Sequence, residues 1–183
     1  MHFQRWHIGS VVADIATAVA DYRRFGPCNA SEVARLSTRK WDNHAATFVD
    51  ETVEVAFLRD AGGETIELIR PITSTGPQAR LLAQRPGPSH AAYWCDDPGA
   101  AAGAMLEDGA AIVHITLGTA ANPEALVERG GPRALLPVAG AIYLRLPGGL
   151  VVELNRRPAN LDGMAAIWGD ALRQTLPEVG GAG

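Results

Sequence analysis

The chain has 183 residues, of which 47% are hydrophobic and 20% charged, and its formal net charge is −4. This is the composition of a globular protein, and no apolar run approaches the ~20 residues needed to cross a bilayer, so we expect no membrane partner. The acidic balance without a cluster of Lys and Arg argues against nucleic acid as the partner, and the two cysteines lack the spacing of a thiolate metal site. Because the N-terminus also lacks the basic-then-apolar pattern of a secretory signal, we expect a cytoplasmic protein that binds a small molecule.

The first half of the chain predicts a strand, a helix and then further strands. Asp14 is a typical N-cap, and the helix that it begins ends at Gly26, with Ile15 and Val19 on its apolar face. Residues 27–43 are polar and predict little beyond one short strand. We expect strands at residues 3–12, 33–36, 52–58 and 64–70, the last two joined by a turn at the paired glycines 62 and 63.

The second half repeats this order after a linker. Residues 71–88 contain four prolines, which is typical of a linker, around a short helical patch at 79–84. Pro98 follows an acidic cap and begins a second helix that ends near Asp108. Residues 118–137 predict a long irregular excursion of the kind that often forms a binding loop. We expect strands at residues 89–95, 111–116, 141–146 and 150–155.

These elements divide the chain into four parts. We assign a first module to residues 1–71, a linker to 72–87, a second module to 88–158, and a C-terminal helix with a disordered tail to 159–183. The helix, at 160–176, is amphipathic, and its apolar face predicts packing over a sheet or a contact within a homodimer.

The two halves align as an internal repeat. When His90 is set on His7, each histidine is followed by an aspartate after seven residues and by a glycine after nineteen. Each half also closes with a Gly-Gly pair and, four residues later, a glutamate, which is Glu67 in the first half and Glu153 in the second. A unit of one strand, one helix and three strands exposes an apolar sheet face, so we expect the two copies to curve around each other and bury it.

The repeat predicts a metal site made by His7, Glu67, His90 and Glu153. Taken singly, each would pass for an ordinary core or surface residue, but their coincidence at equivalent strand positions predicts that they converge on the inner face of the sheet. Two imidazoles and two carboxylates suit a divalent ion such as Ni, Co, Zn, Fe or Mn, with positions left for water or substrate. The ion would also remove the repulsion between two neighbouring carboxylates.

These motifs resemble the vicinal oxygen chelate superfamily, which includes glyoxalase I, methylmalonyl-CoA epimerase, extradiol dioxygenases and the fosfomycin and bleomycin resistance proteins. The resemblance covers residues 4–157 and implies an α+β fold, in which two paired βαβββ modules form a cupped mixed sheet around a metal site; the C-terminal helix is additional. It is carried by His7-Ile8-Gly9 with Asp14, Glu64-Thr65-Ile66-Glu67-Leu68-Ile69, His90-Ala91-Ala92-Tyr93 with Asp96-Asp97, and Leu146-Pro147-Gly148-Gly149-Leu150-Val151-Val152-Glu153-Leu154.

The ligand pattern is similar to that of glyoxalase I and of methylmalonyl-CoA epimerase, where the first acidic position is usually Gln. It implies a metal-dependent isomerase or lyase that moves a proton next to a metal-bound carbonyl or thioester through an enolate. Glu67 and Glu153 are the candidate bases, and the sequence leaves open which of them acts. Asp50, Glu51 and Glu54 lie near the extra acidic position of the epimerases, but none aligns with it, so the choice between epimerase and glyoxalase chemistry stays open.

Two other functions are compatible with the same fold. Extradiol dioxygenases use three protein ligands, two His and one Glu, so the second carboxylate argues against an iron-dependent dioxygenase. Resistance proteins that only bind a drug tend to lack the metal ligands, so the complete set of four argues against a non-catalytic binding protein.

Four further residues are candidates for substrate contacts, namely Glu54, Trp94, Tyr143 and Arg145. Tyr143 and Arg145 share a strand face, from which Arg145 could bind a substrate carboxylate or phosphate. Trp94 has the same strand parity as His90, which predicts that it lines the cavity.

The histidines at positions 44 and 114 fall outside the repeat. His44 and His114 have no counterpart in the other half of the chain. We therefore expect both in loops or at the surface.

Overall fold

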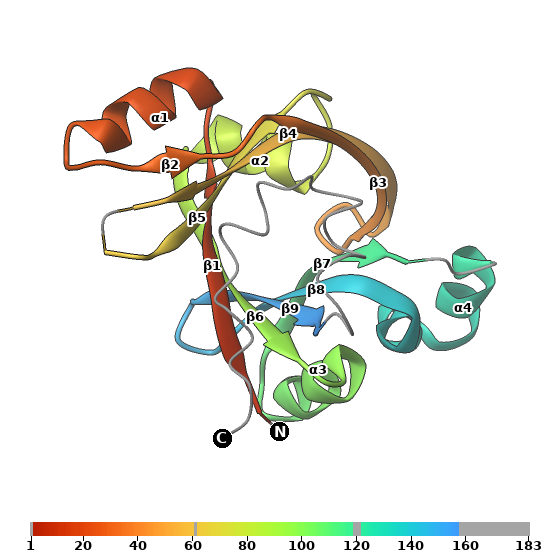
Figure 1. Ribbon diagram of the computed structural model, residues 1–183. Coiled ribbons are helices and arrows are strands. Elements are labelled where there is room, and N and C mark those ends of the chain that lie inside the picture. The colour runs from red at the N-terminus through yellow and green to blue at the C-terminus, as the bar shows by residue number, and fades with distance from the viewer. Residues whose placement is uncertain (1, 61, 119–121, 158–183) are drawn as a thin grey trace.

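The computed structural model describes residues 2–60, 62–118 and 122–157. Nine strands form one mixed sheet that curls into a cup (Figure 1). The strands are β1 (Gln4–Val11), β2 (Asn29–Ala30), β3 (Ala34–Asp42), β4 (Thr47–Arg59), β5 (Thr65–Pro71), β6 (Gly87–Cys95), β7 (Ala111–Leu117), β8 (Ala139–Arg145) and β9 (Val151–Arg156). The helices are α1 (Ile15–Arg23), α2 (Pro77–Gln84), α3 (Pro98–Glu107), α4 (Pro123–Gly130) and the 3-10 helix η1 (Pro132–Val138).

The two modules have the same topology. In the first, β1 pairs in parallel with β5, and β5, β4 and β3 follow as antiparallel neighbours. In the second, β6 pairs in parallel with β9, and β9, β8 and β7 follow in the same way. The modules join at two antiparallel junctions, β1 with β6 and β3 with β7. The predicted pair of βαβββ modules in a cupped mixed sheet is therefore confirmed.

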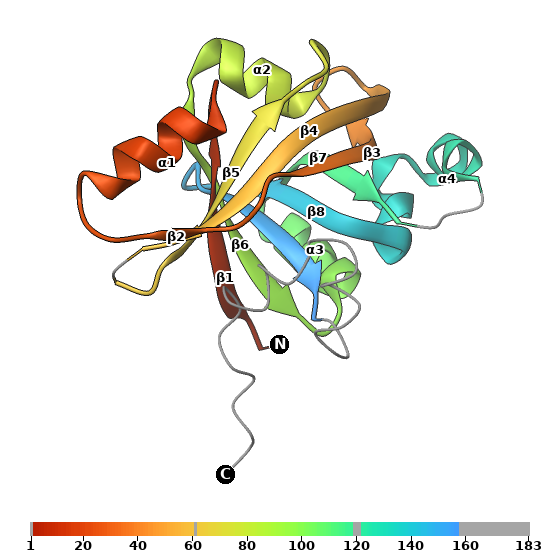
Figure 2. The same ribbon diagram turned by 45° about the horizontal axis from the view of Figure 1, so that its top comes forward.

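Helices α1 and α3 cover the outer face of the cup (Figure 2). Strand alternation separates the two faces: on β5, Ile66 and Leu68 pack with α1, whereas Glu67 and Ile69 face the interior of the cup. Each helix begins at the predicted aspartate cap, since Asp14 accepts a hydrogen bond from Thr17 N at 2.7 Å and Asp97 accepts one from Ala100 N at 3.0 Å.

Two local predictions are wrong. The short strand expected at 33–36 is the long strand β3, which pairs with β4 along its whole length. Polar side chains occupy both faces of β3 and hide its alternation. The excursion expected at 118–137 to be irregular contains α4 and η1. Asn122 caps α4 by accepting a hydrogen bond from Ala125 N at 3.2 Å, and its proline at the first helical position needs no N–H partner.

The segment between the modules contains α2, which starts two residues before the predicted helical patch. The C-terminal helix and tail predicted for 159–183 lie outside the described residues. Among the residues that the structure describes, no helix is long and apolar enough to cross a membrane.

Candidate metal centre

The four predicted ligands occupy equivalent positions in the two modules. His7 lies on β1, two residues before Gly9, which is paired with Glu67 on β5. His90 lies on β6, two residues before Ala92, which is paired with Glu153 on β9. The antiparallel β1–β6 junction then sets His90 opposite Gly9. The repeat in the sequence thus becomes a near-symmetric arrangement of two imidazoles and two carboxylates.

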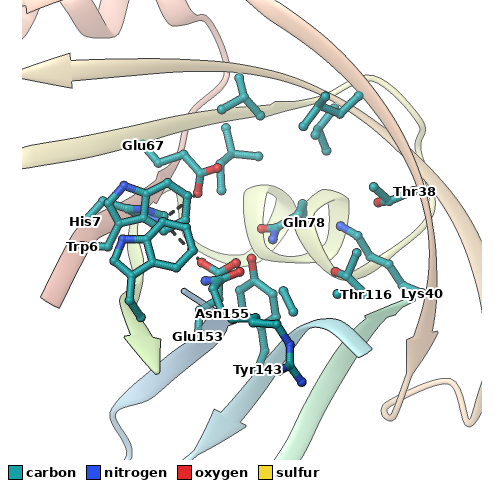
Figure 3. Close-up of a pocket in the computed structure, with 18 residues that line it drawn as sticks. Trp6, His7, Thr38, Lys40, Glu67, Gln78, Thr116, Tyr143, Glu153 and Asn155 are labelled. Atoms are coloured by element: carbon teal, nitrogen blue, oxygen red, sulfur yellow. Dashed lines mark ion pairs between the residues drawn. The ribbon is translucent and has the colours of Figure 1, made fainter. Parts of the chain in front are cut away.

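The four side chains converge at the centre of the cup (Figure 3). His7 Nε2 lies 3.2 Å from Glu67 Oε2 and 3.4 Å from Glu153 Oε2. His90 Nε2 lies 3.6 Å from Glu67 Oε2 and 3.1 Å from Glu153 Oε2. All four ligand atoms are within 4.8 Å of one another, and all four residues are buried. This places one donor atom of each residue around a common point.

The same four atoms, His7 Nε2, Glu67 Oε2, His90 Nε2 and Glu153 Oε2, have no hydrogen-bond partner among the described residues. A buried polar atom without a partner costs about 1–3 kcal/mol, and these four can satisfy one another only while the histidines are protonated, so with neutral histidines they call for another group that satisfies them. A divalent cation accepts electron pairs from imidazole nitrogen and carboxylate oxygen alike and balances two negative charges. The residues present therefore fit a divalent metal.

The neighbours of His90 orient its ring for this role. Ser89 Oγ donates a hydrogen bond to the Gly9 carbonyl at 3.1 Å and lies 3.0 Å from His90 Nδ1. Because the serine proton is directed to the carbonyl, Nδ1 carries the hydrogen and donates it to Ser89, which leaves the lone pair of Nε2 free for a metal. Gly9 is required for the same placement, since a Cβ there would lie 1.9 Å from the His90 ring.

Electrostatics keep both carboxylates ionised. Burial lowers the pKa of His90, but its contacts with Glu153 and Glu67 outweigh burial and raise the pKa to about 9. The pKa of His7 is raised for the same reason. Burial raises the pKa of the two carboxyls, yet the adjacent histidines overcome it, so that the pKa of Glu67 is lowered and that of Glu153 lies well below its usual range. Without metal, the cluster pairs protonated histidines with carboxylates, and a divalent ion would take the place of the protons.

The cluster lies at one end of a cavity of about 320 Å³. Trp94 and Tyr143, both predicted to contact a substrate, line this cavity. Glu54 does not, because it lies between the cavity-lining Val53 and Val55 on the opposite face of β4.

Glu54 and Arg145 are placed outside this cavity. Glu54 Oε2 accepts a hydrogen bond from Arg70 Nε at 2.9 Å. Arg145 is exposed and lines a separate pocket of about 300 Å³ together with His44 and Arg80. Any contact of these two side chains with a substrate in the main cavity would require the substrate to extend beyond it.

A family comparison agrees with this geometry. Residues 6–124 match the model of the Glyoxalase/Bleomycin resistance protein/Dioxygenase superfamily, which is more than half of the chain. The chain belongs to this superfamily. No curated protein sequence matches the chain.

Several solved structures share the fold of this chain at low sequence identity. A hypothetical protein from Bacillus halodurans C-125 is 18% identical with a TM-score of 0.52, covering 87% of this chain and 98% of its own. Methylmalonyl-CoA epimerase from Mycobacterium tuberculosis is 19% identical with a TM-score of 0.54, and the match covers 87% of this chain and 91% of the epimerase chain. A mutant 4-hydroxymandelate synthase from Streptomyces coelicolor is 18% identical with a TM-score of 0.53, covering 94% of this chain and 55% of its own.

The sequence did not predict that Trp6 forms part of the cavity wall. Trp6 lines the cavity and stacks on Trp94 with ring centroids 4.0 Å apart. Strict alternation would turn Trp6 away from the face of His7, but a register shift between Arg5 and His7 lets both side chains face inward. No sequence signal marks this irregularity.

His114 is not at the surface, contrary to the prediction. Its ring is buried and stacks on Tyr143 with centroids 3.8 Å apart and planes at 22°. Burial keeps the pKa of His114 well below its usual range, so the ring is neutral and packs as an aromatic group. His44, which also lacks a repeat partner, is exposed as predicted.

Proposed function

We propose that the protein is a divalent-metal-dependent isomerase or lyase that transfers a proton next to a carbonyl through an enolate. The observation that carries the proposal is the set of four buried donor atoms, two from His and two from Glu, that face one another without other partners. A bound divalent ion would supply Lewis acidity to a substrate carbonyl and so lower the cost of enolate formation.

The two carboxylates are the candidate bases. Glu67 and Glu153 enter the cluster from strands of different modules, so they approach a substrate in the cavity from different sides. The adjacent histidines lower the pKa of both carboxyls in the metal-free cluster, and a bound divalent cation would likewise favour the ionised form that a general base requires. One carboxylate can accept the α-proton and return it to the same or to a different carbon.

Tyr143 supplies a proton donor beside them. Its pKa is raised well above the usual range, first by burial and then by the charges of Glu153 and Glu67, so the phenol keeps its hydrogen. Its ring lies between those of His90 and His114, with centroids 5.0 and 3.8 Å away. A phenolic O–H fixed in this way can donate a hydrogen bond to a substrate oxygen in the cavity that it lines.

The donor set favours this chemistry over oxygen activation. Non-haem iron oxygenases bind the metal with two histidines and one carboxylate, which leaves positions for both substrate and dioxygen. A second carboxylate leaves fewer positions, enough for a chelating substrate.

The direct test is exchange of substrate protons with deuterium oxide. Metal-loaded protein would be incubated with a panel of small 2-oxo acids, hydroxyketones and acyl thioesters, and loss of α-C–H signals would be followed by proton NMR. Thioesters are included because one structure of this fold is methylmalonyl-CoA epimerase with methylmalonyl-CoA bound. We expect exchange that requires metal and that falls about 100- to 10,000-fold in Glu67→Gln or Glu153→Gln.

The matched control is Glu64→Gln, because Glu64 directly precedes β5, the strand that carries Glu67, and is exposed and paired with Arg5. It should leave exchange unchanged. Metal-dependent oxygen uptake in place of exchange would favour an iron dioxygenase, and tight ligand binding that is indifferent to metal would favour a binding protein. Either result would overturn the proposal.

A further inference from the structure

The cavity has a second polar end, away from the metal cluster. Figure 3 shows Thr38, Lys40 and Thr116 on the side opposite His7 and Glu67. Thr38 and Lys40 project from β3 on the same face, and Thr116 on β7 is the register partner of Lys40. The lining between the two ends is largely apolar, although three further polar residues also line the cavity, namely Tyr143, Asn155 and Arg156.

Lys40 is a buried cation at this second end. Its side chain is 7% exposed, and its Nζ donates a hydrogen bond to Glu51 Oε2 at 2.6 Å. An ammonium group has three N–H donors, and Glu51 is the one hydrogen-bond partner that the described residues provide. Lys40 also lines the cavity, so its remaining donors are available to a molecule that enters it.

Glu51 is held behind Lys40 by helix α2. Its side chain is fully buried, and Oε1 accepts hydrogen bonds from Gln78 N at 2.8 Å and Ala79 N at 3.2 Å, at the helix N-terminus. Gly76 permits this close approach, because a Cβ there would lie 2.6 Å from Glu51 Oε1. The positive end of the helix offsets the Glu51 charge, so the Lys40 charge is only partly neutralised by its partner.

Gln78 adds an unsatisfied polar group on the same side. It is 2% exposed and lines the cavity, and its Oε1 has no hydrogen-bond partner among the described residues. A buried amide without partners is costly, as is a buried ammonium with unused donors. An anionic group with hydrogen-bonding oxygens would satisfy the unused donors of Lys40, whereas Gln78 Oε1 is an acceptor and needs a hydrogen-bond donor, such as a hydroxyl, from the same molecule.

We propose that Lys40 binds a carboxylate of the substrate, so that the substrate is a small acid with a chelating carbonyl at one end and a carboxylate at the other. This inference rests on the proposed function, because the carbonyl end is assigned to the metal cluster. Lys40 is then a residue that determines specificity, and Glu51 positions it.

The test compares pairs of ligands that differ only at the far end. Cobalt-loaded protein would be titrated by calorimetry with 2-oxo dicarboxylates of increasing chain length and with 2-oxo monocarboxylates of equal carbon number, such as 2-oxoglutarate and 2-oxopentanoate. We expect at least one dicarboxylate to bind about tenfold to a hundredfold more tightly than its monocarboxylate partner, as for a charged hydrogen bond.

Variants assign that preference to Lys40. Lys40→Met should abolish it by weakening the dicarboxylate alone, and Lys40→Arg should retain part of it. The double variant Lys40→Met/Glu51→Gln removes both charges while keeping an acceptor for α2, so it tests the same point if the single variant folds poorly. The control is Arg39→Met, which removes an exposed charge next to Lys40 on the opposite face of β3 and should keep the preference.

The outcomes separate the two proposals. Failure to bind cobalt would remove the proposed function and this inference with it. Cobalt binding with equal affinities for both ligands of every pair would contradict only the carboxylate subsite. A preference that survives in Lys40→Met would also contradict it, and would assign Lys40 a purely structural role.

Discussion

The two ends of the cavity are built in different ways. The metal end is assembled by both modules, each of which supplies one His and one Glu from equivalent strand positions. The Lys40 end is less symmetric, since the equivalent strands β3 and β7 contribute different side chains to it and the connecting helix α2 adds Gln78. Duplication thus accounts for a shared centre, and the segments that differ between the copies can set what binds there.

The metal end is also less symmetric than its four ligands suggest. Gly9 gives space to the ring of His90, whereas its repeat equivalent Ala92, which is paired with His7, carries a methyl group. Ser89 fixes the His90 tautomer, but His7 Nδ1 has no partner among the described residues. His90 is therefore the more rigidly placed of the two imidazoles.

The largest expected effect on the metal end comes from removing one of its four ligands. His90→Ala should weaken binding of zinc or cobalt by roughly a thousandfold or more, because one of four donors is lost and two buried carboxylates lose a partner. Competition with a chromophoric chelator measures this loss. His44→Ala removes an exposed histidine and should bind metal like the unaltered protein.

A substitution at Gly9 tests whether metal affinity depends on the position of the His90 ring as well as on its presence. In Gly9→Ala the added Cβ would lie 1.9 Å from His90, so the ring must move, and we expect metal affinity to fall by about 100-fold, the upper range for altered outer-shell contacts. Thermal unfolding should show destabilisation by about 1–3 kcal/mol. Gly103→Ala in α3 meets nothing within 4 Å and should be neutral or slightly stabilising. Equal effects of the two substitutions would contradict the steric account.

Protons and metal should compete at the histidine cluster. Because the metal-free pKa of His90 is raised to about 9 and that of His7 is also raised, metal binding below these values must release a proton from each ring, and affinity should rise by at least about tenfold per pH unit up to about 9. Calorimetry in buffers of different ionisation enthalpy counts the protons released. Affinity that is constant between pH 6.5 and 9 would contradict the His90 assignment.

The same pKa predicts an opposite trend for stability without metal. A raised folded pKa contributes stability that is complete below the unfolded value of 6.5 and is lost as the pH rises through about 9. The metal-free protein should therefore melt at a lower temperature at pH 9 than at pH 6.5, and excess zinc should reverse the trend. A melting temperature that rises over this interval would show that other groups dominate.

The smallest expected effect comes from Ser89, which touches the metal end only through His90. Ser89→Ala should lower metal affinity by about tenfold, since Nδ1 loses the acceptor that fixes its tautomer. Ser89→Thr keeps the hydroxyl and should restore most of that loss in the same chelator competition. If the alanine and threonine variants bind metal equally, the hydroxyl has no part in holding the ring.

The repeat explains why the metal end could be predicted from sequence and the Lys40 end could not. Histidine and glutamate recur at fixed spacing in both halves, so strand pairing brings them together in the predicted fold. Lys40 lies in a stretch whose charged residues fall on both faces of β3, which hides the strand itself. Its partner Glu51 and the helix of Gln78 join it only through tertiary structure.

The positions of Trp6 and His114 were also not predicted from the sequence, and each has a local structural cause. Trp6 faces the cavity because of a strand irregularity, which no residue type announces. His114 is buried because β7 pairs with both β3 and β8, so that its ring meets Tyr143 across the sheet. Alternation and composition describe one strand at a time, whereas these positions depend on which strands become neighbours.

The most direct test of the central claim is anomalous diffraction from crystals of the protein grown or soaked with cobalt or zinc. Data collected on either side of the metal absorption edge would locate the ion without reference to activity. We predict one strong peak within bonding distance of His7 Nε2, His90 Nε2 and the carboxylates of Glu67 and Glu153. A fully loaded protein with its peak elsewhere, or crystals that take up no metal at this cluster, would contradict the account.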